Sequence, residues 1–265
     1  MDYNDLFLEI DGNVAVITLN RPEKLNALSR GLQQEMLALC AQLRNDDNVR
    51  AVIWTGAGRG FCSGADLTGP RPEGAPEPTW QESLDEDGWV GRQVKAAYLI
   101  GKPTIAAVNG VAAGAGMSLS LACDFRIGSD TARFKTVFVE RALSPDAGMS
   151  YFLPRIVGIG RAMELVLTSR AVGADEALAM GLLNKVVPAA DLLTEAKALA
   201  NMIAAHPPLA VQMAKRALQH SLDSDFETQL HYETRAIQLA GAAKNDRMES
   251  ALSFREKRPG KYTGH

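Results

Sequence analysis

The pattern of apolar and polar residues divides the chain into two parts. Up to about residue 190, short apolar runs typical of strands alternate with patterns of helical spacing, and residues 191–265 show helical spacing alone. Such alternation is typical of an α/β fold. We therefore predict an α/β core over residues 1–190, followed by a helical region over residues 191–265 that packs on a neighbouring subunit or on its own core.

Local signals place the ends of several elements. Residues 7–20 alternate apolar and polar positions around Asp11-Gly12-Asn13, which predicts a hairpin. Ser29 is suited to cap a helix that ends near Arg44. Further strands are expected at residues 49–55, 104–108, 125–127, 132–135 and 183–187, and further helices at residues 92–100, 161–168, 175–180, 192–203, 208–222 and 226–243.

A helix is also predicted after residue 143. Ser144 is a suitable N-cap, Pro145 fits the first helical position and Asp146 falls in the first turn. We expect this helix to run through Leu153, where Pro154 interrupts it. The helix dipole stabilises an acid in a first turn by about 0.3–1 kcal/mol, so this position alone gives Asp146 no catalytic role.

Two turns rich in small residues can present backbone N–H groups to a ligand. In residues 102–124, KPTIAAVNGVAAGAGMSLSLACD, Gly114 and Gly116 lie among alanines, so the backbone there is accessible. In the second turn, FCSGADL at residues 61–67, the N–H of Ala65 has room to point inward. The alternative is that these small residues only let a helix pack closely on a strand.

The composition changes sharply between residues 68 and 91, where Pro, Glu, Asp and Gly dominate. A loop of this length is uncommon inside a compact domain. We expect it to be either disordered or a lid over a binding site.

Composition and charge narrow the classes of partner. The net charge is -3 and no block of basic residues is present, so neither nucleic acid nor an anionic membrane is expected. The three cysteines are far apart and odd in number, which favours a reducing cytoplasm over a disulfide framework. No apolar run approaches the ~20 residues of a membrane span, and the acidic N-terminus does not resemble a signal peptide.

Several common chemistries lack their motifs. The chain contains no GxSxG, no HExxH and no GxxxxGK[ST], and its four histidines all lie in the helical region. The glycines at positions 56, 58 and 60 do not have GxGxxG spacing. We therefore expect no metal and no nucleotide cofactor, and the two small-residue turns and the carboxylates remain as candidate chemistry.

Five motifs in order resemble the crotonase (enoyl-CoA hydratase/isomerase) superfamily: ITLNRPEKLNAL, FCSGADL, KPTIAAVNGVAAGAG, RIVGIGRAMELVLTSR and FREKRPGKY. The resemblance covers essentially the whole chain. It implies a spiral of ββα repeats with a C-terminal helical trimerisation region, and trimers that often pair into hexamers. It also implies an acyl-CoA substrate and no cofactor.

The resemblance assigns the backbone groups of the site. The two N–H groups that hold the thioester oxygen correspond to Ala65 and Ala115, where the family usually has glycine at the second position. One such donor is typically worth ~10²–10³ in rate, because it stabilises the oxyanion of a thioester enolate. The CoA-binding turns correspond to Lys24, Leu25, Ala27, Ser63, Gly64, Asp66 and Leu67.

The positions of the acidic residues distinguish between the reactions of this family. Hydratases of this family use two glutamates, and the matching positions here hold Ser118 and Phe138. Asp146 stands where 3-enoyl-CoA isomerases and 2-(1,2-epoxy-1,2-dihydrophenyl)acetyl-CoA isomerases carry an acid. The dehalogenase branch also has an Asp there, together with a histidine at the position of Gly91. The acyl pocket is expected at Gly114, Ser118, Phe138 and Met149.

The resemblance therefore implies an acyl-CoA isomerase of fatty-acid or phenylacetate degradation, with Asp146 as its single acid/base. Apolar neighbours are expected to raise the pKa of Asp146 by desolvation. Glu140 is expected to be a surface or salt-bridge residue. Two alternatives stay open: an enoyl-CoA hydratase that uses unconventional residues, and an acyl-CoA-binding protein without turnover.

Overall fold

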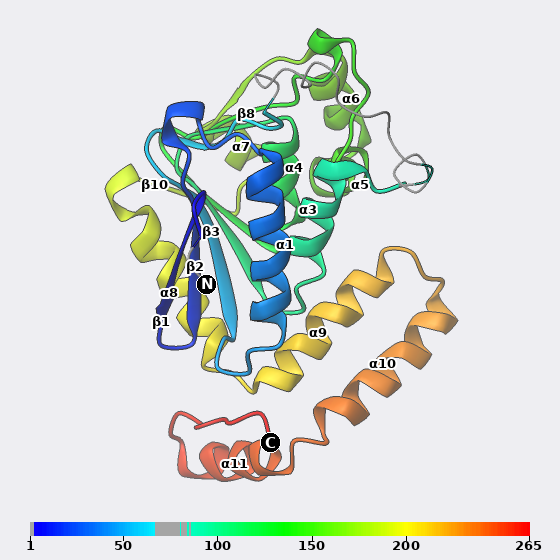
Figure 1. Cartoon of the computed structure of the whole chain (residues 1–265). Coiled ribbons are helices and arrows are strands. Elements are labelled where there is room, and N and C mark those ends of the chain that lie inside the picture. Colours follow the sequence, from blue (N-terminus) through cyan, green and yellow to red (C-terminus); the bar gives the residue numbers. More distant parts are fainter. Residues whose placement is uncertain (1–2, 67–79, 81–83, 85) are drawn as a thin grey trace.

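The computed structural model describes residues 3–66, 80, 84 and 86–265 (Figure 1). The strands of this part are β1 (Leu6–Asp11), β2 (Val14–Leu19), β3 (Ala51–Gly56), β4 (Gly60–Cys62), β5 (Thr104–Val108), β6 (Val111–Ala113), β7 (Phe125–Ser129), β8 (Arg133–Lys135), β9 (Val172–Gly173) and β10 (Lys185–Val187). Its α-helices are α1 (Arg30–Arg44), α3 (Gly88–Tyr98), α4 (Ala115–Ala122), α5 (Met149–Val157), α6 (Ile159–Thr168), α7 (Ala174–Ala179), α8 (Leu192–Ala204), α9 (Pro208–Ser221), α10 (Phe226–Ala240) and α11 (Lys244–Glu256). Short 3₁₀ turns are η1 (Pro22–Lys24), η2 (Val139–Arg141) and η3 (Ala189–Asp191).

The strands form two sheets, and the chain passes from one sheet to the other in a repeating order. The larger sheet has the order β1-β2-β3-β5-β7-β10 and the smaller one has the order β4-β6-β8-β9. Strand β3 of the larger sheet is followed by β4 of the smaller sheet and then by α3; β5, β6 and α4 repeat this order, and β7 and β8 lead on to α5. This succession is the predicted spiral of ββα units.

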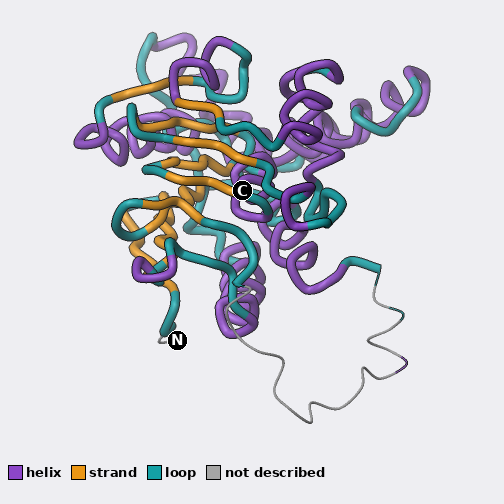
Figure 2. Tube along the Cα trace, turned by 90° about the horizontal axis from the view of Figure 1, so that it is seen from above, coloured by secondary structure: helices purple, strands orange, loops and turns teal. Residues whose placement is uncertain are grey.

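Side chains on the two faces of the larger sheet enter separate apolar clusters. Along β3, Val52 and Trp54 face the cluster that includes α1, α3, α4 and α5, whereas Ala51 and Ile53 face the cluster that includes α8. The alternation follows the period of two residues of a strand. Figure 2 shows the strands stacked together with helices on both sides.

The C-terminal helices differ in how they lie relative to the sheets. Helix α8 packs on the larger sheet through Leu192, Ala196 and Ala200, whereas α9, α10 and α11 extend away from the sheets (Figure 1). Helix α9 remains tied to the core because Lys215 donates to Asp124 over 2.7 Å. The division of the chain near residue 190 remains a prediction.

Most of the predicted elements are present. The hairpin β1–β2 is antiparallel, and the Ser29 hydroxyl accepts a hydrogen bond from the N–H of Leu32 at 3.0 Å, as a helix cap does. The predictions missed β4 and β6, placed the start of α3 at residue 92 in place of residue 88, and joined α10 to residues beyond 240. Of the predicted loop at residues 68–91, residues 68–79, 81–83 and 85 lie outside the described part.

No helix in the described part of the chain is long and apolar enough to span a lipid bilayer.

Candidate active site

The turn after β2 is held to the turn after β4 by hydrogen bonds. Asn26, which is fully buried, donates from Nδ2 to the carbonyl of Gly60 over 2.7 Å and accepts from the N–H of Arg21 over 2.9 Å. The Ser63 N–H donates to the carbonyl of Leu25 over 2.9 Å. Both Leu25 and Asn26 have positive φ, so the backbone folds tightly here. These contacts place the two predicted CoA-binding turns side by side.

The N–H of Ala65 points away from the segment around Leu28, which lies beside it. Ala65 forms a parallel bridge with Leu28, in which the Leu28 N–H donates to Gly64 and the Asp66 N–H donates to Leu28. In such a bridge the residues on either side of Ala65 make the hydrogen bonds. The Ala65 N–H therefore points away from Leu28. No described backbone carbonyl outside the regular strands accepts a hydrogen bond from it.

The Ala65 turn lies directly against the start of α4. A Cβ added to Gly64 would lie 2.8 Å from the Ala113 carbonyl and 3.4 Å from the Ala115 nitrogen. A Cβ added to Gly116 would lie 2.1 Å from the carbonyl of Cys62. Only glycine permits this approach, so the two turns rich in small residues bring the amides of Ala65 and Ala115 into one region.

Ala115 is the first residue of α4, and Gly114 precedes it with a φ of 50°. The first N–H groups of a helix have no partner within the helix. They also lie at the positive end of the helix dipole, which favours an anion. The Ala115 N–H is thus available to an oxyanion at the point where α4 meets the Ala65 turn.

Asp146 lies beside the first turn of α4. The Ser118 hydroxyl contacts the Gly114 carbonyl and the Asp146 carbonyl, each at 3.4 Å, and the Ser118 N–H donates to Gly114 over 3.0 Å. These contacts bring Asp146 next to the position one helical turn after Ala115. The predicted site residues on α4 and on the segment before α5 therefore meet.

The prediction that Asp146 lies in the first turn of a helix is wrong. Helix α5 begins at Met149, whose N–H donates to the Asp146 carbonyl over 2.9 Å. Ala147 and Gly148 have φ values of 51° and 81°, so the chain turns sharply between Asp146 and the helix. The helix also continues through Pro154 to Val157. A stabilising place in a first turn therefore does not account for Asp146.

Asp146 is exposed at the surface of the single chain, yet nearby protein atoms desolvate its carboxyl group. This desolvation raises the pKa of Asp146 above its ordinary value and is its only resolved cause. The direction agrees with the prediction. A carboxyl group of this kind is suited to accept a proton and to return it.

Two apolar residues predicted to line the acyl pocket lie in the protein interior. Phe138 and Met149 are buried, and Phe138 immediately precedes η2. Val137 has a positive φ of 57°, and its Cγ2 would lie 3.1 Å from a Cβ added to Gly114. A β-branched residue in this conformation is strained, and strain of this kind is concentrated at functional sites. The sequence gives no signal for the strain at Val137.

The other acids near the site have partners of their own. Glu140 forms an ion pair with Lys135 at 2.7 Å, so the prediction that it is a surface or salt-bridge residue is confirmed. Asp66 forms an ion pair with Arg21 at 2.8 Å, and Arg21 also donates to the carbonyl of Ala27. Sequence reasoning did not single out Arg21 and Asn26, although both fall inside the ITLNRPEKLNAL motif.

Three further predicted CoA-binding residues, Lys24, Leu25 and Ala27, lie in the turn after β2. Lys24 is exposed, and its carbonyl accepts a hydrogen bond from the Ser63 hydroxyl over 3.1 Å. Leu25 is half-buried and Ala27 is buried. Leu67, also predicted to bind CoA, lies outside the described residues.

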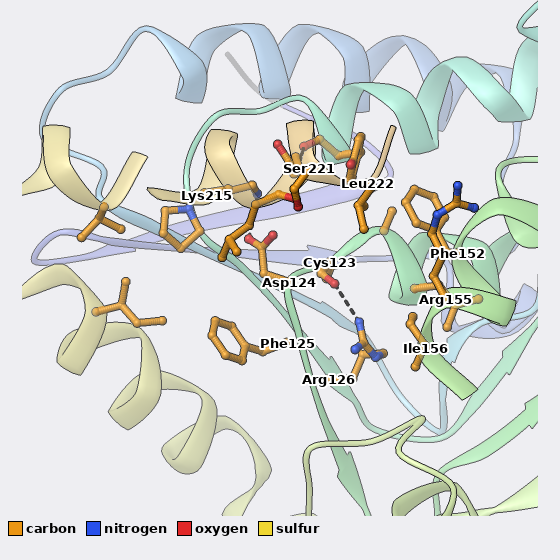
Figure 3. A pocket seen from close by; sticks show the side chains of 18 residues that line it. Cys123, Asp124, Phe125, Arg126, Phe152, Arg155, Ile156, Lys215, Ser221 and Leu222 are labelled. Atoms are coloured by element: carbon orange, nitrogen blue, oxygen red, sulfur yellow. Dashed lines mark hydrogen bonds and ion pairs between the residues drawn. The ribbon is translucent and has the colours of Figure 1, made fainter. Parts of the chain in front are cut away.

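A cavity of about 520 Å³ lies at the far end of α4, away from Ala65, Ala115 and Asp146, none of which lines it (Figure 3). Residues at the ends of α3 and α4 and along α5 and α9 line it, among them Tyr98, Cys123, Phe152 and Lys215. Arg126, which also lines it, donates to the Cys123 carbonyl over 2.7 Å. Its lining does not include the residues predicted to hold the thioester.

Neither metal nor thiol chemistry is indicated in the described part of the chain. No group of three or more His, Cys, Asp or Glu side chains there is placed to hold a metal ion. All three cysteines are free and buried, and burial raises the pKa of Cys62, beside the Ala65 turn, to about 12. A thiol with this pKa remains protonated at neutral pH and is a poor nucleophile.

Comparison with known proteins gives one consistent family. Residues 9–265 match the family model described as enoyl-CoA hydratase/isomerase. The chain is 38% identical over 260 residues to the short-chain-enoyl-CoA hydratase of Clostridium acetobutylicum, covering 97% of both chains. It is 34% identical over 262 residues to the 1,2-epoxyphenylacetyl-CoA isomerase of Escherichia coli, covering 96% of this chain and 97% of the relative.

Solved structures agree with this result. The crystal structure of an enoyl-CoA hydratase from Bacillus anthracis superposes with a TM-score of 0.91 at 36% identity, covering 99% of this chain and 100% of the other. The likeness therefore includes the core and the C-terminal helices. The chain is an enzyme of the crotonase superfamily and belongs to its enoyl-CoA hydratase/isomerase family.

Proposed function

We propose that the chain is an acyl-CoA isomerase that works through a thioester enolate, with Asp146 as its acid/base. The observation that carries this proposal is the contact between Ser118 and Asp146. The contact joins the Ser118 hydroxyl to the backbone carbonyl of Asp146 and supports a role for residue 146 near the start of α4. Ser118 and Phe138 themselves occupy the positions that hold glutamates in hydratases. A single acid/base can move a proton but cannot share the activation of water with a second carboxylate.

The reaction can be written with this chain's own groups. Asp146 removes a proton from the carbon next to the thioester or from the γ carbon, and the electron pair moves onto the thioester oxygen. The N–H groups of Ala65 and Ala115 hold the resulting oxyanion, with support from the dipole of α4. The protonated Asp146 then returns the proton to the other carbon, so the double bond shifts and no atom is gained or lost.

The raised pKa of Asp146 suits both steps. A carboxyl group with a pKa nearer to neutrality is a stronger base than an ordinary aspartate and is still able to donate the proton. Phe138 and Met149 are expected to border the acyl group and to keep water from the enolate. The 1,2-epoxyphenylacetyl-CoA isomerase among the relatives supports a test with an epoxide as well as with an alkene.

The test is the substitution Asp146→Asn, which keeps the size of the side chain and removes its basicity. We expect kcat for the isomerisation of a 3-enoyl-CoA, or of the 1,2-epoxide of phenylacetyl-CoA, to fall by ~10²–10⁴-fold, the usual contribution of a general base. Binding of the substrate should change little. Conversion is followed by separating the two acyl-CoA isomers by chromatography.

Glu140→Gln provides the matched control, because it makes the same chemical change in an exposed ion pair six residues away. It should leave kcat within about twofold of the wild type. Activity of the Asp146→Asn enzyme near the wild-type level, on whichever substrate the wild type converts, would contradict the proposed role.

A second candidate is hydration of a 2-enoyl-CoA. It is favoured by the relatives named as hydratases, including the one at 38% identity. Loss of the ultraviolet absorbance of crotonyl-CoA measures hydration directly. Our proposal predicts little or no loss, whereas rapid loss that survives Asp146→Asn would favour the hydratase. Binding of acyl-CoA by calorimetry without conversion of any substrate would favour a binding protein.

We also propose that α9 to α11 contact neighbouring subunits in a trimer or hexamer. Large apolar side chains on these helices are exposed in the single chain, among them Leu218, Phe226, Ile237 and Phe254. Exposed apolar area of this extent marks an interaction surface. Light scattering after size-exclusion chromatography measures the assembly, and a monomer at micromolar concentration would contradict the proposal.

A further inference from the structure

The cavity between α9 and the core has the size and the lining of a ligand site. Its volume of about 520 Å³ falls within the range of ~300–1,000 Å³ that is usual for small-molecule pockets. Most of the side chains that line it are apolar, and they include the rings of Tyr98, Phe125 and Phe152 (Figure 3). None of the described candidate active-site residues lines it, so this cavity is a separate place in the fold.

The lining includes a buried cation that has no carboxylate partner. Arg126 of β7 is only 6% exposed, and no described carboxylate forms an ion pair with it. Its Nε donates to the Leu182 carbonyl over 2.8 Å and its Nη1 donates to the Cys123 carbonyl over 2.7 Å, but its Nη2 makes no hydrogen bond to a described residue. Nη2 is not among the enclosed polar atoms that lack a partner, so a ligand in the cavity can reach it.

The other charged groups that line the cavity are already paired. Asp124 forms an ion pair with Lys215 at 2.7 Å, and Arg155 forms one with Asp223 at 3.4 Å. Each of these pairs is neutral, so Arg126 leaves the lining with one uncompensated positive charge. Desolvation lowers the pKa of Arg126, and the nearby Asp124 offsets only part of this effect. The protein alone therefore does not compensate the guanidinium fully.

We propose that this cavity binds a carboxylic acid with an apolar body, whose carboxylate pairs with Arg126. The planar guanidinium matches the geometry of a carboxylate, and hydrogen bonds between two charged groups are the strong ones. The aromatic and aliphatic side chains of the lining cover the body of such a ligand. This binding site goes beyond the proposed function and does not rest on it.

The competing explanation is that Arg126 serves only the fold. Its hydrogen bond to the Cys123 carbonyl lies at the C-terminal end of α4, where the helix dipole favours a positive charge. This role accounts for the N–H groups of Nε and Nη1. It uses neither N–H group of Nη2, and it predicts that the cavity has no preference for an acid.

The test is calorimetric titration of the full-length protein with three molecules that share one body: 4-phenylbutyrate, 4-phenylbutanol and 4-phenylbutylamine. We expect the acid to bind at least tenfold more tightly than the alcohol, because it adds a hydrogen bond between charged groups. The amine should bind more weakly than the alcohol. An excess of butyryl-CoA should leave the affinity for the acid unchanged, because the thioester occupies the candidate active site and not this cavity.

Two substitutions locate the bound acid. Arg126→Gln keeps a side-chain donor and removes the charge, so the preference for the acid over the alcohol should disappear. Ile156→Trp fills the cavity from α5 and retains Arg126, so it should weaken binding of the acid at least tenfold. Ile159→Trp is the matched control: Ile159 is 65% exposed on α6 and does not line the cavity, so its affinity should stay within twofold of the wild type.

Circular dichroism establishes that each variant is folded, and if Arg126→Gln does not fold, Ile156→Trp and the three probes decide the question. A preference below tenfold in the wild-type protein would overturn the proposal, as would a preference that survives Arg126→Gln. Undiminished binding to Ile156→Trp, or displacement of the acid by butyryl-CoA, would place the acid elsewhere and would overturn it as well.

Discussion

Two aspartates near opposite ends of α4 have opposite surroundings. Asp124, just after the C-terminal end, accepts hydrogen bonds from the Thr104 N–H at 2.7 Å, the Thr104 hydroxyl at 3.0 Å and the Lys215 ammonium at 2.7 Å. Asp146, beside the first turn, has a carboxylate that accepts no hydrogen bond from a described residue, and desolvation raises its pKa. The Asp124 carboxylate stabilises the fold, whereas the Asp146 carboxylate is available to a ligand.

The contrast separates a structural acid from the proposed catalytic one. Carboxylates that hold a fold together are ionised and fully hydrogen-bonded, because an unpaired buried charge is costly. A general base must instead keep its oxygens accessible and its pKa raised. Removing each charge should therefore have opposite effects on the stability of this protein.

The larger effect is expected at Asp124. Asp124→Asn weakens the ion pair with Lys215, a residue whose side chain is only 6% exposed. Removing one partner of such a pair should lower the free energy of unfolding by about 3 kcal/mol, because the buried ammonium loses its counter-charge. Urea denaturation followed by circular dichroism measures the change.

Asp130→Asn is the control for this substitution, since Asp130 is exposed at the end of β7. It should change the free energy of unfolding by no more than about 0.5 kcal/mol. If Asp124→Asn is equally mild, the account of Asp124 as a structural acid is wrong.

A smaller effect of opposite sign is expected at Asp146. Since the folded protein raises the pKa of this carboxyl group, the ionised form is disfavoured by folding, and this cost is present above the folded-state pKa. Asp146→Asn should therefore unfold at slightly higher urea than the wild type at pH 7, by less than about 1 kcal/mol, because solvent screens an exposed group.

The gain should vanish as the pH falls below about 3.9, the ordinary pKa of aspartate, because the carboxyl group is then protonated in both the folded and the unfolded states. The measurement is a urea midpoint for both proteins across this pH range. A loss of stability at pH 7 in Asp146→Asn would instead indicate a structural acid.

The sequence predicted those parts of the fold that depend on local signals. The hairpin around Gly12 and the Ser29 cap of α1 are examples, because their turn and capping residues act within a few positions. Strands β4 and β6 have only three residues each, too few to show alternation, and pairing with distant strands stabilises them. Such pairing leaves no local signal.

The start of α5 was predicted wrongly because Ser144, Pro145 and Asp146 match the residue preferences of a helix N-terminus. Tertiary contacts override this preference: the Asp146 carbonyl accepts from Met149 and from Ser118, and Ala147 and Gly148 take positive φ values. The contact with Ser118, 28 residues earlier in the chain, is not visible in a local pattern.

The candidate site was predicted by resemblance, and its residues converge through contacts that the sequence did not reveal. Asn26 and Arg21 hold together the turns that carry Ala65 and the predicted CoA-binding residues.

The most direct test of the account is exchange of the hydrogens next to the thioester. A saturated acyl-CoA is incubated with the enzyme in deuterated water, and mass spectrometry follows the uptake of deuterium at that carbon. The account predicts uptake with the wild-type enzyme and a rate at least ~10²-fold lower with Asp146→Asn. Equal rates in the two proteins, or no uptake with the wild type, would contradict proton removal by Asp146.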